Sequence, residues 1–247
     1  MVKHALLDNV THKDLKIMVK RGAEYGDNLW HAPVVPREFR QVAATYPIVF
    51  RKVAASNQFE AVALFGFAAK ENLFLDQQGW QADYIPLSVE RIPFMIGQAT
   101  DRITGEQQLV MHVDMEHPRV SFTEGVSVFL EQGGNSPFLE RMNSVLAELM
   151  SGLNASKRFV DILQAEDLLE PFTLKFPLNA GESIALAGFY TINEDVLRAL
   201  NGDQLARLHN QNFLELIYLV IASLANIGKL IRKKQNQISL AGTGYEP

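Results

Sequence analysis

Two different spacings of apolar residues divide the chain near residue 136. Before this point, short apolar runs alternate with glycine, proline and polar residues, a pattern typical of strands joined by turns. After it, apolar residues recur every three or four positions, which is the period of a helix with one buried face. The runs that predict strands cover residues 15–19, 48–53, 61–67 and 109–113. The pattern therefore predicts an α+β protein with a β-rich N-terminal half.

Helical signals begin at Ser136 and Pro137, because serine can cap a helix and proline fits its first turn. Apolar residues then follow at helical spacing, and a second helical piece over 154–164 continues the pattern. Pro171 is expected to stop this piece, since proline cannot continue a helix. These residues predict a helical segment in the middle of the chain.

The C-terminal third predicts a hairpin followed by a long helix. Residues 172–177 alternate apolar and polar side chains, and a turn at 179–181 leads to an apolar strand over 184–192. From 203 to 235, apolar residues are so dense that we expect one long helix running through the core. The expected fold packs the β-rich half with this long, buried C-terminal helix and the middle helical segment.

The length of the chain and the absence of linker-like segments predict its domain organisation. The chain has 247 residues, 47% of them hydrophobic, and a chain of this size buries roughly 70% of the surface that its unfolded form exposes. We find no internal repeat, low-complexity tract or linker. The sequence therefore predicts a single α+β domain over 1–241, followed by a flexible tail at 242–247.

Composition excludes several classes of function. The sequence has no cysteine, which excludes disulfides, thiolate metal sites and cysteine nucleophiles. It has 23 basic and 28 acidic residues, which gives a net charge of −5, and these charged residues are spread along the chain. Nucleic-acid binding requires a basic footprint, so no nucleic-acid partner is expected.

Two stretches bear on location. Only 5–7 is continuously apolar before Asp8, far short of a signal peptide, and the apolar run over 216–227 is shorter than the ~20 residues that span a membrane. We expect a cytoplasmic protein without a membrane span. The basic residues at 229–234 could meet an anionic membrane surface or an acidic partner, or they could simply complement the helix dipole.

A metal site is one candidate for chemistry. His112 and Asp114 are two positions apart on a predicted strand, so both face the same side, and His117 follows closely. Two histidines and one carboxylate are the ligand set that leaves open positions on non-haem iron. A more distant histidine, His31 or His209, could replace His117. The alternative is a polar strand end followed by a loop, with no metal.

An aromatic and basic cluster is the candidate ligand site. Trp80, Tyr84, Arg91 and Phe94 combine flat aromatic faces with a planar cation, which suits stacking on sugars, indoles or aromatic peptides. The alternative is that the aromatic residues belong to the core and that Arg91 pairs with a carboxylate such as Asp83.

Familiar enzyme signatures are missing from the sequence. We find no Gly-x-Ser-x-Gly elbow, phosphate-binding glycine loop, His-Glu-x-x-His pair or dinucleotide fingerprint. No catalytic residue and no cofactor is therefore assigned, and whether the protein is an enzyme stays open.

Four stretches, taken in order, resemble the SapC family of bacterial proteins. The family takes its name from a protein associated with a surface layer, and its members also occur beside sugar-uptake receptors, flavin-dependent halogenases and cupin-like proteins. The resemblance implies no defined activity, and within 109–114 it is Asp114 that matches the family. The stretches are Gly-Trp-Gln-Ala-Asp-Tyr-Ile-Pro at 79–86 with Arg-Ile-Pro-Phe at 91–94, 109–114 with Glu124, Gly125 and Phe129, 136–171, and 188–192 continuing through 214–224.

These observations favour a cytoplasmic accessory or binding protein, acting beside the uptake or modification of sugars or aromatic compounds. Its partner would be another protein or a small aromatic or sugar ligand, and a homodimer is open. One alternative is a non-haem metal-dependent enzyme that uses the His-x-Asp pair. Another is a surface-layer structural protein, although this would require an export signal that is not visible at the N-terminus.

Overall fold

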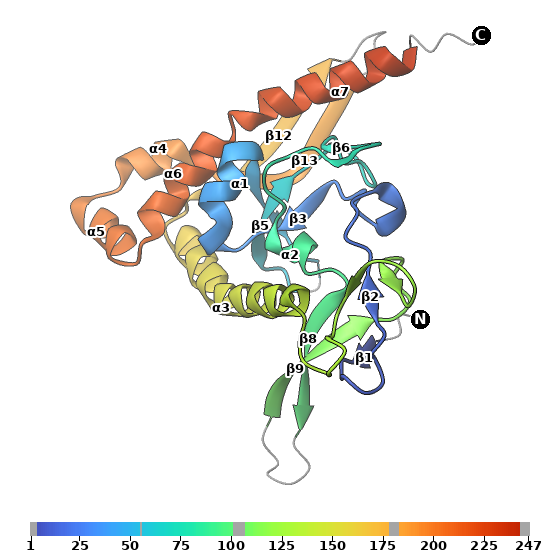
Figure 1. Cartoon of the computed structure of the whole chain (residues 1–247). Coiled ribbons are helices and arrows are strands. Elements are labelled where there is room, and N and C mark those ends of the chain that lie inside the picture. Colours follow the sequence, from blue (N-terminus) through green and yellow to red (C-terminus); the bar gives the residue numbers. More distant parts are fainter. Residues whose placement is uncertain (1–3, 55, 101–106, 178–182, 243–247) are drawn as a thin grey trace. The chain divides into compact units, whose positions relative to one another are not determined.

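The fold is taken from a computed structural model that describes residues 4–54, 56–100, 107–177 and 183–242 (Figure 1). It is an α+β protein, as the hydrophobic pattern predicts. Contacts group the chain into two compact units, each assembled from three separate segments. Unit 1 comprises Met1–Asp27, Leu75–Trp80 and Leu87–Ser151, and unit 2 comprises Asn28–Phe74, Gln81–Pro86 and Gly152–Pro247.

Unit 1 is built from small antiparallel sheets. A three-stranded sheet has the order β1-β9-β8, a second has the order β10-β2-β11, and β6 pairs with β7. The predicted strand at 109–113 is confirmed as part of β9, whereas only two residues of 15–19 form a strand. The elements are β1 (His4–Leu6), β2 (Lys16–Ile17), η1 (Ala23–Tyr25), β6 (Leu75–Asp76), β7 (Gly79–Trp80), α2 (Leu87–Glu90), β8 (Phe94–Thr100), β9 (Gln107–Asp114), β10 (Val120–Ser121) and β11 (Val126–Ser127).

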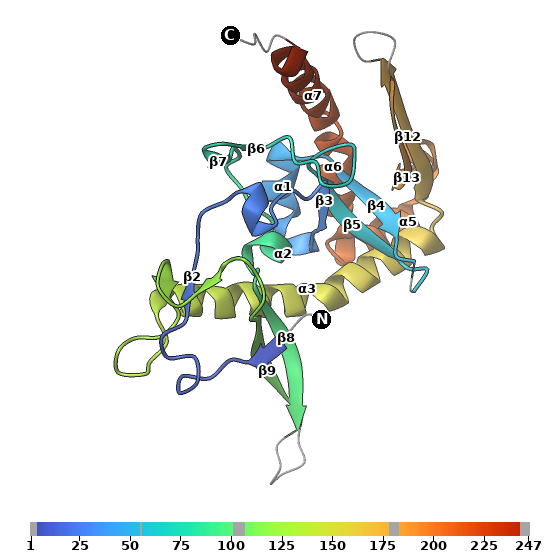
Figure 2. The ribbon, with the colours of Figure 1, turned by 90° about the vertical axis from the view of Figure 1, so that its right-hand side faces the viewer.

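Unit 2 contains a five-stranded antiparallel sheet of order β12-β13-β4-β5-β3. Figure 2 shows β12 and β13 as a long two-stranded ribbon, and β4 and β5 as its continuation in the sheet. The predicted strands at 48–53 and 61–67 and the predicted hairpin are confirmed, while the turn at 179–181 lies outside the described residues. The strands are β3 (His31–Pro33), β4 (Ile48–Lys52), β5 (Phe59–Leu64), β12 (Leu169–Pro177) and β13 (Ser183–Ile192).

An aromatic cluster joins the helices of unit 2 to its sheet. The ring of Phe159 lies 5.9 Å from Phe39, 6.2 Å from Phe50 and 5.3 Å from Phe213, and all four side chains are buried. Burying a large aromatic side chain contributes about 1.5–3 kcal/mol, so this cluster is a main part of the core. The remaining helices of unit 2 are η2 (Pro36–Glu38), α1 (Phe39–Thr45), α4 (Glu194–Ala199), α5 (Gly202–Asn210), α6 (Phe213–Ser223) and α7 (Asn226–Gly242).

The middle helical segment is one continuous helix, α3 (Pro137–Ala165), rather than two pieces. Its predicted start is confirmed, because the backbone N–H of Leu139 donates to Ser136 Oγ at 3.2 Å. The predicted stop at Pro171 is wrong, since this residue lies in β12 and pairs with Tyr190. The chain leaves the helix at Asp167, which has a φ of +53°, a left-handed conformation that ends a helix before any proline is needed.

The predicted long C-terminal helix is divided into α5, α6 and α7. Asn212 has a φ of +59°, and asparagine tolerates this left-handed conformation between two helices. The expectation of a buried helix is also wrong in part, because α6 buries one stripe that includes Ile217 and Val220, whereas Tyr218 is 55% exposed. Apolar composition predicts a helix here, but it does not distinguish a buried face from an exposed one.

The same region bears on the prediction of no membrane span. Among the described residues, the segment Phe213–Ser239 is long and apolar enough to cross a membrane by length and composition, and 28% of its most apolar window is buried. The core helix of a soluble protein meets the same two criteria.

Candidate functional site

The predicted metal ligands lie in and after β9 of unit 1. His112 and Asp114 face the same side of the sheet, as strand alternation requires. The His112 ring leans over the neighbouring strand β8, because a Cβ added to Gly97 would lie only 3.0 Å from the ring. Gly97 pairs with Val110, which precedes His112 along β9, whereas Asp114 follows it. The ring therefore does not turn toward the carboxylate.

His117 lies in the bend after β9. Its Nδ1 accepts a hydrogen bond from the backbone N–H of Arg119 at 3.2 Å. Burial, and secondly the Arg119 guanidinium, lower the pKa of His117, so the neutral imidazole is favoured. Among the described residues, no group of three or more His, Asp or Glu side chains is arranged to hold a metal. A metal site at these positions stays a prediction.

The two more distant histidines belong to unit 2. His209 is exposed on α5. His31 lies on β3, and its ring centroid is 4.6 Å from that of Trp30. Burial, and secondly the Arg51 guanidinium, lower the pKa of His31 from 6.5 to about 4, with 3.4 Å between Arg51 Nη1 and His31 Nε2. This histidine is neutral at pH 7.

The aromatic and basic cluster divides between the two units. In unit 1, Phe94 is fully buried and its ring lies 6.1 Å from that of Phe138, so it belongs to the core. Arg91 Nη1 donates to the backbone carbonyl oxygen of Phe94 at 2.7 Å, and burial lowers the pKa of Arg91. Trp80, also in unit 1, pairs with Leu75 in the β6–β7 hairpin.

Tyr84 belongs to unit 2, where both ends of the residue have defined partners. Its hydroxyl donates to Glu38 Oε2 at 2.8 Å, and its backbone carbonyl accepts from the Tyr46 hydroxyl. Glu38 is itself buried and accepts from the backbone N–H of Val35 at 3.0 Å. These contacts anchor Tyr84 to the segment before α1. A ligand site shared by the four predicted residues stays a prediction.

Two of the basic residues at 229–234, Lys233 and Lys234, also have partners within unit 2, and they lie inside α7 rather than at its end, because this helix continues to Gly242. Lys233 Nζ lies 4.9 Å above the Phe74 ring, and Lys234 pairs with Glu71. Both interactions hold the segment after β5 against α7. They give these two cations a structural role that the sequence did not predict.

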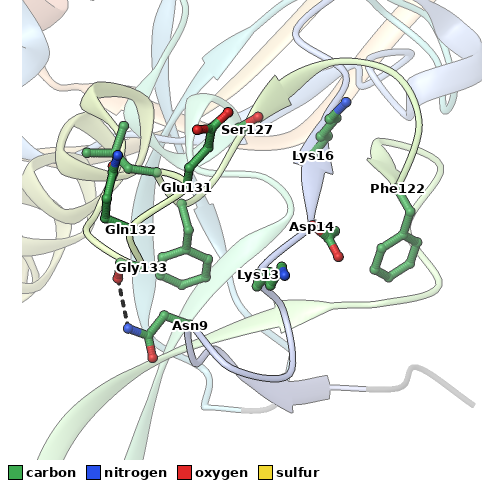
Figure 3. A pocket seen from close by; sticks show the side chains of 11 residues that line it. Asn9, Lys13, Asp14, Lys16, Phe122, Ser127, Glu131, Gln132 and Gly133 are labelled. Atoms are coloured by element: carbon green, nitrogen blue, oxygen red, sulfur yellow. Dashed lines mark hydrogen bonds between the residues drawn. The ribbon is translucent and has the colours of Figure 1, made fainter.

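A cavity of about 540 Å³ in unit 1, here called the unit 1 cavity, was not predicted from the sequence. Figure 3 shows Lys13 and Asp14 between Phe122 on one side and the turn at Gln132–Gly133 on the other. Its walls therefore come from segments more than a hundred residues apart. The lining residues are Asn9, Lys13, Asp14, Lys16, Phe122, Ser127, Phe129, Leu130, Glu131, Gln132 and Gly133.

Hydrogen bonds hold these walls in place. The turn after Phe129 is closed by a bond from the N–H of Gly133 to the carbonyl of Leu130 at 2.8 Å, and Gly133 has a φ of +84°, which favours glycine. Asn9 Nδ2 donates to the Gly133 carbonyl at 2.8 Å and so joins the two walls. On the other side, Lys16 Nζ donates to the Thr123 carbonyl at 3.0 Å.

The lining of the unit 1 cavity combines balanced charge with an exposed ring. Two cations, Lys13 and Lys16, are offset by two carboxylates, Asp14 and Glu131. Phe122 is 55% exposed, which leaves an apolar face open to solvent. Cavities of about 300–1,000 Å³ with an apolar wall and a few convergent polar groups are the usual form of small-molecule sites. The arrangement can hold a ligand by stacking and hydrogen bonding without a net charge.

Comparison with known proteins gives one match. A family model described as SapC matches residues 7–230. No curated protein and no solved structure matches the chain.

Proposed function

The chain therefore belongs to the SapC family, and we propose that it is a binding protein that holds a neutral, polyhydroxylated ligand, a sugar, in the unit 1 cavity. The observation that carries this proposal is the exposed Phe122 ring, which stands across the cavity from the polar residues of the 131–133 turn. One face of a sugar ring is apolar and can cover an aromatic ring, while its hydroxyls point outward. The cavity offers both kinds of contact.

The lining favours a sugar over a purely aromatic ligand. Asn9, Asp14 and Lys13 supply both donors and acceptors, which hydroxyl groups can satisfy in either direction. An aromatic hydrocarbon ring would leave these polar groups without partners, and each desolvated polar group costs about 1–3 kcal/mol. The two cations and two carboxylates of the lining balance, so a ligand of strong net charge gains no advantage there.

Isothermal titration calorimetry with glucose, galactose, mannose and maltose tests this proposal. We expect one of these sugars to bind the full chain, and Phe122→Ala to weaken binding by about tenfold because stacking on the ring is lost. Asp14→Ala should weaken binding similarly by removing an acceptor. Both side chains are exposed, so the fold should survive both changes.

Tyr218→Ala is the matched control, since Tyr218 is an aromatic residue of unit 2 that is also 55% exposed. It should bind sugar like the unaltered protein. If none of the four sugars binds, or if Phe122→Ala and Asp14→Ala bind with unchanged affinity, the unit 1 cavity is not a sugar site.

A further inference from the structure

Unit 1 carries a second cavity, of about 280 Å³, which is here called the side cavity. Asn9 and Phe129 line both this cavity and the unit 1 cavity, so the two cavities adjoin. Leu7 follows β1, Met111 lies on β9 and Asn143 lies on α3, and all three line only the side cavity. Every residue of its lining belongs to unit 1.

A single turn contributes to both cavities. Phe129 and Asn135 form an antiparallel bridge, which brings the two ends of the turn to the side cavity. The tip of the same turn, at 131–133, lines the unit 1 cavity. Asn9 is held at this turn by its bond to the Gly133 carbonyl, which Figure 3 shows. The two cavities are therefore fixed next to each other by the same contacts.

The polar groups of the side cavity are mainly amides. Asn9, Asn135 and Asn143 line it, and each amide side chain offers both N–H donors and a carbonyl acceptor. The charged residue of this lining, Asp8, is engaged in its own turn, because its Oδ1 accepts from the backbone N–H of Thr11 at 2.7 Å. Neutral hydroxyl groups therefore suit this lining better than ions do.

Apolar side chains lie beside these amides. Leu139 and Asn143 are four residues apart on α3, so they share one face of the helix. Leu139 is buried, and Leu7 and Met111 are half-buried. The side cavity thus repeats the combination found in the unit 1 cavity, in which polar groups stand next to an apolar wall. This combination matches the two kinds of surface that a sugar ring presents.

We propose that the ligand is an oligosaccharide of at least two rings, with one ring in the unit 1 cavity and the next ring in the side cavity. This inference rests on the proposed function and extends it from the kind of ligand to its length. A single ring in the unit 1 cavity leaves the amides of the side cavity to water. A second ring joined to the first reaches these amides without a second bimolecular association step.

Calorimetry on the full chain tests the length of the ligand. Glucose is compared with maltose and cellobiose, mannose with mannobiose, and galactose with galactobiose. We expect at least one disaccharide to bind about tenfold more tightly than its monosaccharide, because the second ring adds hydrogen bonds to the amides. Asn143→Ala should remove most of this gain and leave monosaccharide binding unchanged. Asn143 is exposed, so the fold should survive the change.

Asn154→Ala is the matched control. Asn154 is an exposed asparagine of the same helix, and it lines neither cavity. Its replacement should leave the binding of monosaccharides and disaccharides unchanged. Phe122→Ala should weaken both kinds of sugar, since Phe122 lines the unit 1 cavity that holds the first ring.

The outcomes distinguish this inference from the proposed function. If a monosaccharide binds and no disaccharide binds more tightly, the two-ring proposal is overturned and the sugar proposal stands. The two-ring proposal is also overturned if the disaccharide gain persists in Asn143→Ala, or if Asn154→Ala removes it equally. If no monosaccharide and no disaccharide binds, both proposals fail.

Discussion

Arg119 is fully buried in unit 1, and its charge is held by a small set of polar groups. Its guanidinium donates to Asp27 Oδ2 at 2.6 Å and to the carbonyls of Met18 at 2.8 Å and Lys20 at 2.6 Å. Asp27 is also buried and accepts from the backbone N–H of Gly22 at 2.9 Å. These bonds tie the N-terminal segment to the residues that follow β9.

Replacing Asp27 with alanine should therefore destabilise unit 1. The change leaves the Arg119 charge buried without its carboxylate, and breaking a buried pair in this way costs about 3–5 kcal/mol. Urea unfolding followed by circular dichroism measures the loss. The double change Asp27→Leu with Arg119→Met removes both charges and should cost less than Asp27→Ala. An equal or larger loss in the double variant would show that the charge pair is not the cause.

His31 should give the protein a pH-dependent stability. Its pKa is lowered from 6.5 to about 4 in the folded protein, so between these values the unfolded chain takes up a proton that the folded protein does not. Stability is fully present above about pH 6.5 and falls as the pH drops toward 4. Urea midpoints measured across this range should fall less steeply in His31→Gln. Parallel curves for the two proteins would contradict this assignment.

At the residue scale, strand periodicity predicts on which side of the sheet a residue lies, but it does not predict how the side chain is oriented there. It places His112 and Asp114 on one side of β9, which is confirmed, because alternation depends only on the strand itself. The direction of the His112 ring depends on the space above Gly97 on β8, a contact that only strand pairing creates. The unit 1 cavity cannot be predicted from the sequence for the same reason, because its walls are brought together only by tertiary contacts such as that between Asn9 and Gly133.

At the element scale, two helical glycines differ in what surrounds them. A Cβ at Gly152 of α3 would lie 2.7 Å from Val35 Cβ, whereas the nearest atom to a Cβ at Gly228 of α7 is Arg232 Nη1 at 3.7 Å. Gly152→Ala should destabilise the protein by about 1–3 kcal/mol, because overpacking exceeds the gain in helix propensity.

Gly228→Ala is the matched comparison and should stabilise the protein by about 0.5–1 kcal/mol, since alanine favours the helix and meets no close neighbour. Thermal unfolding of the two variants measures both effects. Stabilisation of the protein by both substitutions would show that helix propensity, rather than the Val35 contact, governs position 152.

Element starts were easier to predict from the sequence than element ends. Ser136 and Pro137 carry a local signal that needs no tertiary contact, and the start of α3 is confirmed. The ends at Asp167 and Asn212 use left-handed conformations, and neither residue requires such a conformation by its type alone. Proline is the stronger sequence signal, so the sequence predicts the end of this helix too late, at Pro171.

At the scale of the whole molecule, the order of segments explains why no domain boundary is visible in the sequence. The chain enters each unit three times, and α3 contributes residues up to Ser151 to unit 1 and residues from Gly152 to unit 2. A linker is a local feature of composition, so units assembled from interleaved segments do not need one.

This arrangement predicts how the protein responds to being cut. Fragments 1–151 and 152–247 divide the five-stranded sheet, because β3, β4 and β5 lie in the first and β12 and β13 in the second. Phe189 and Tyr190 of β13 then lose their pairing with β4. The backbone N–H and C=O groups along this edge of β13 are left without strand partners. We expect neither fragment alone to show a cooperative thermal transition, and a mixture of the two to recover one. A cooperative transition in fragment 152–247 alone would contradict this expectation. It would mean that the β12–β13 hairpin and the C-terminal helices fold without β4, and that the five-stranded sheet forms between two segments that are each stable alone.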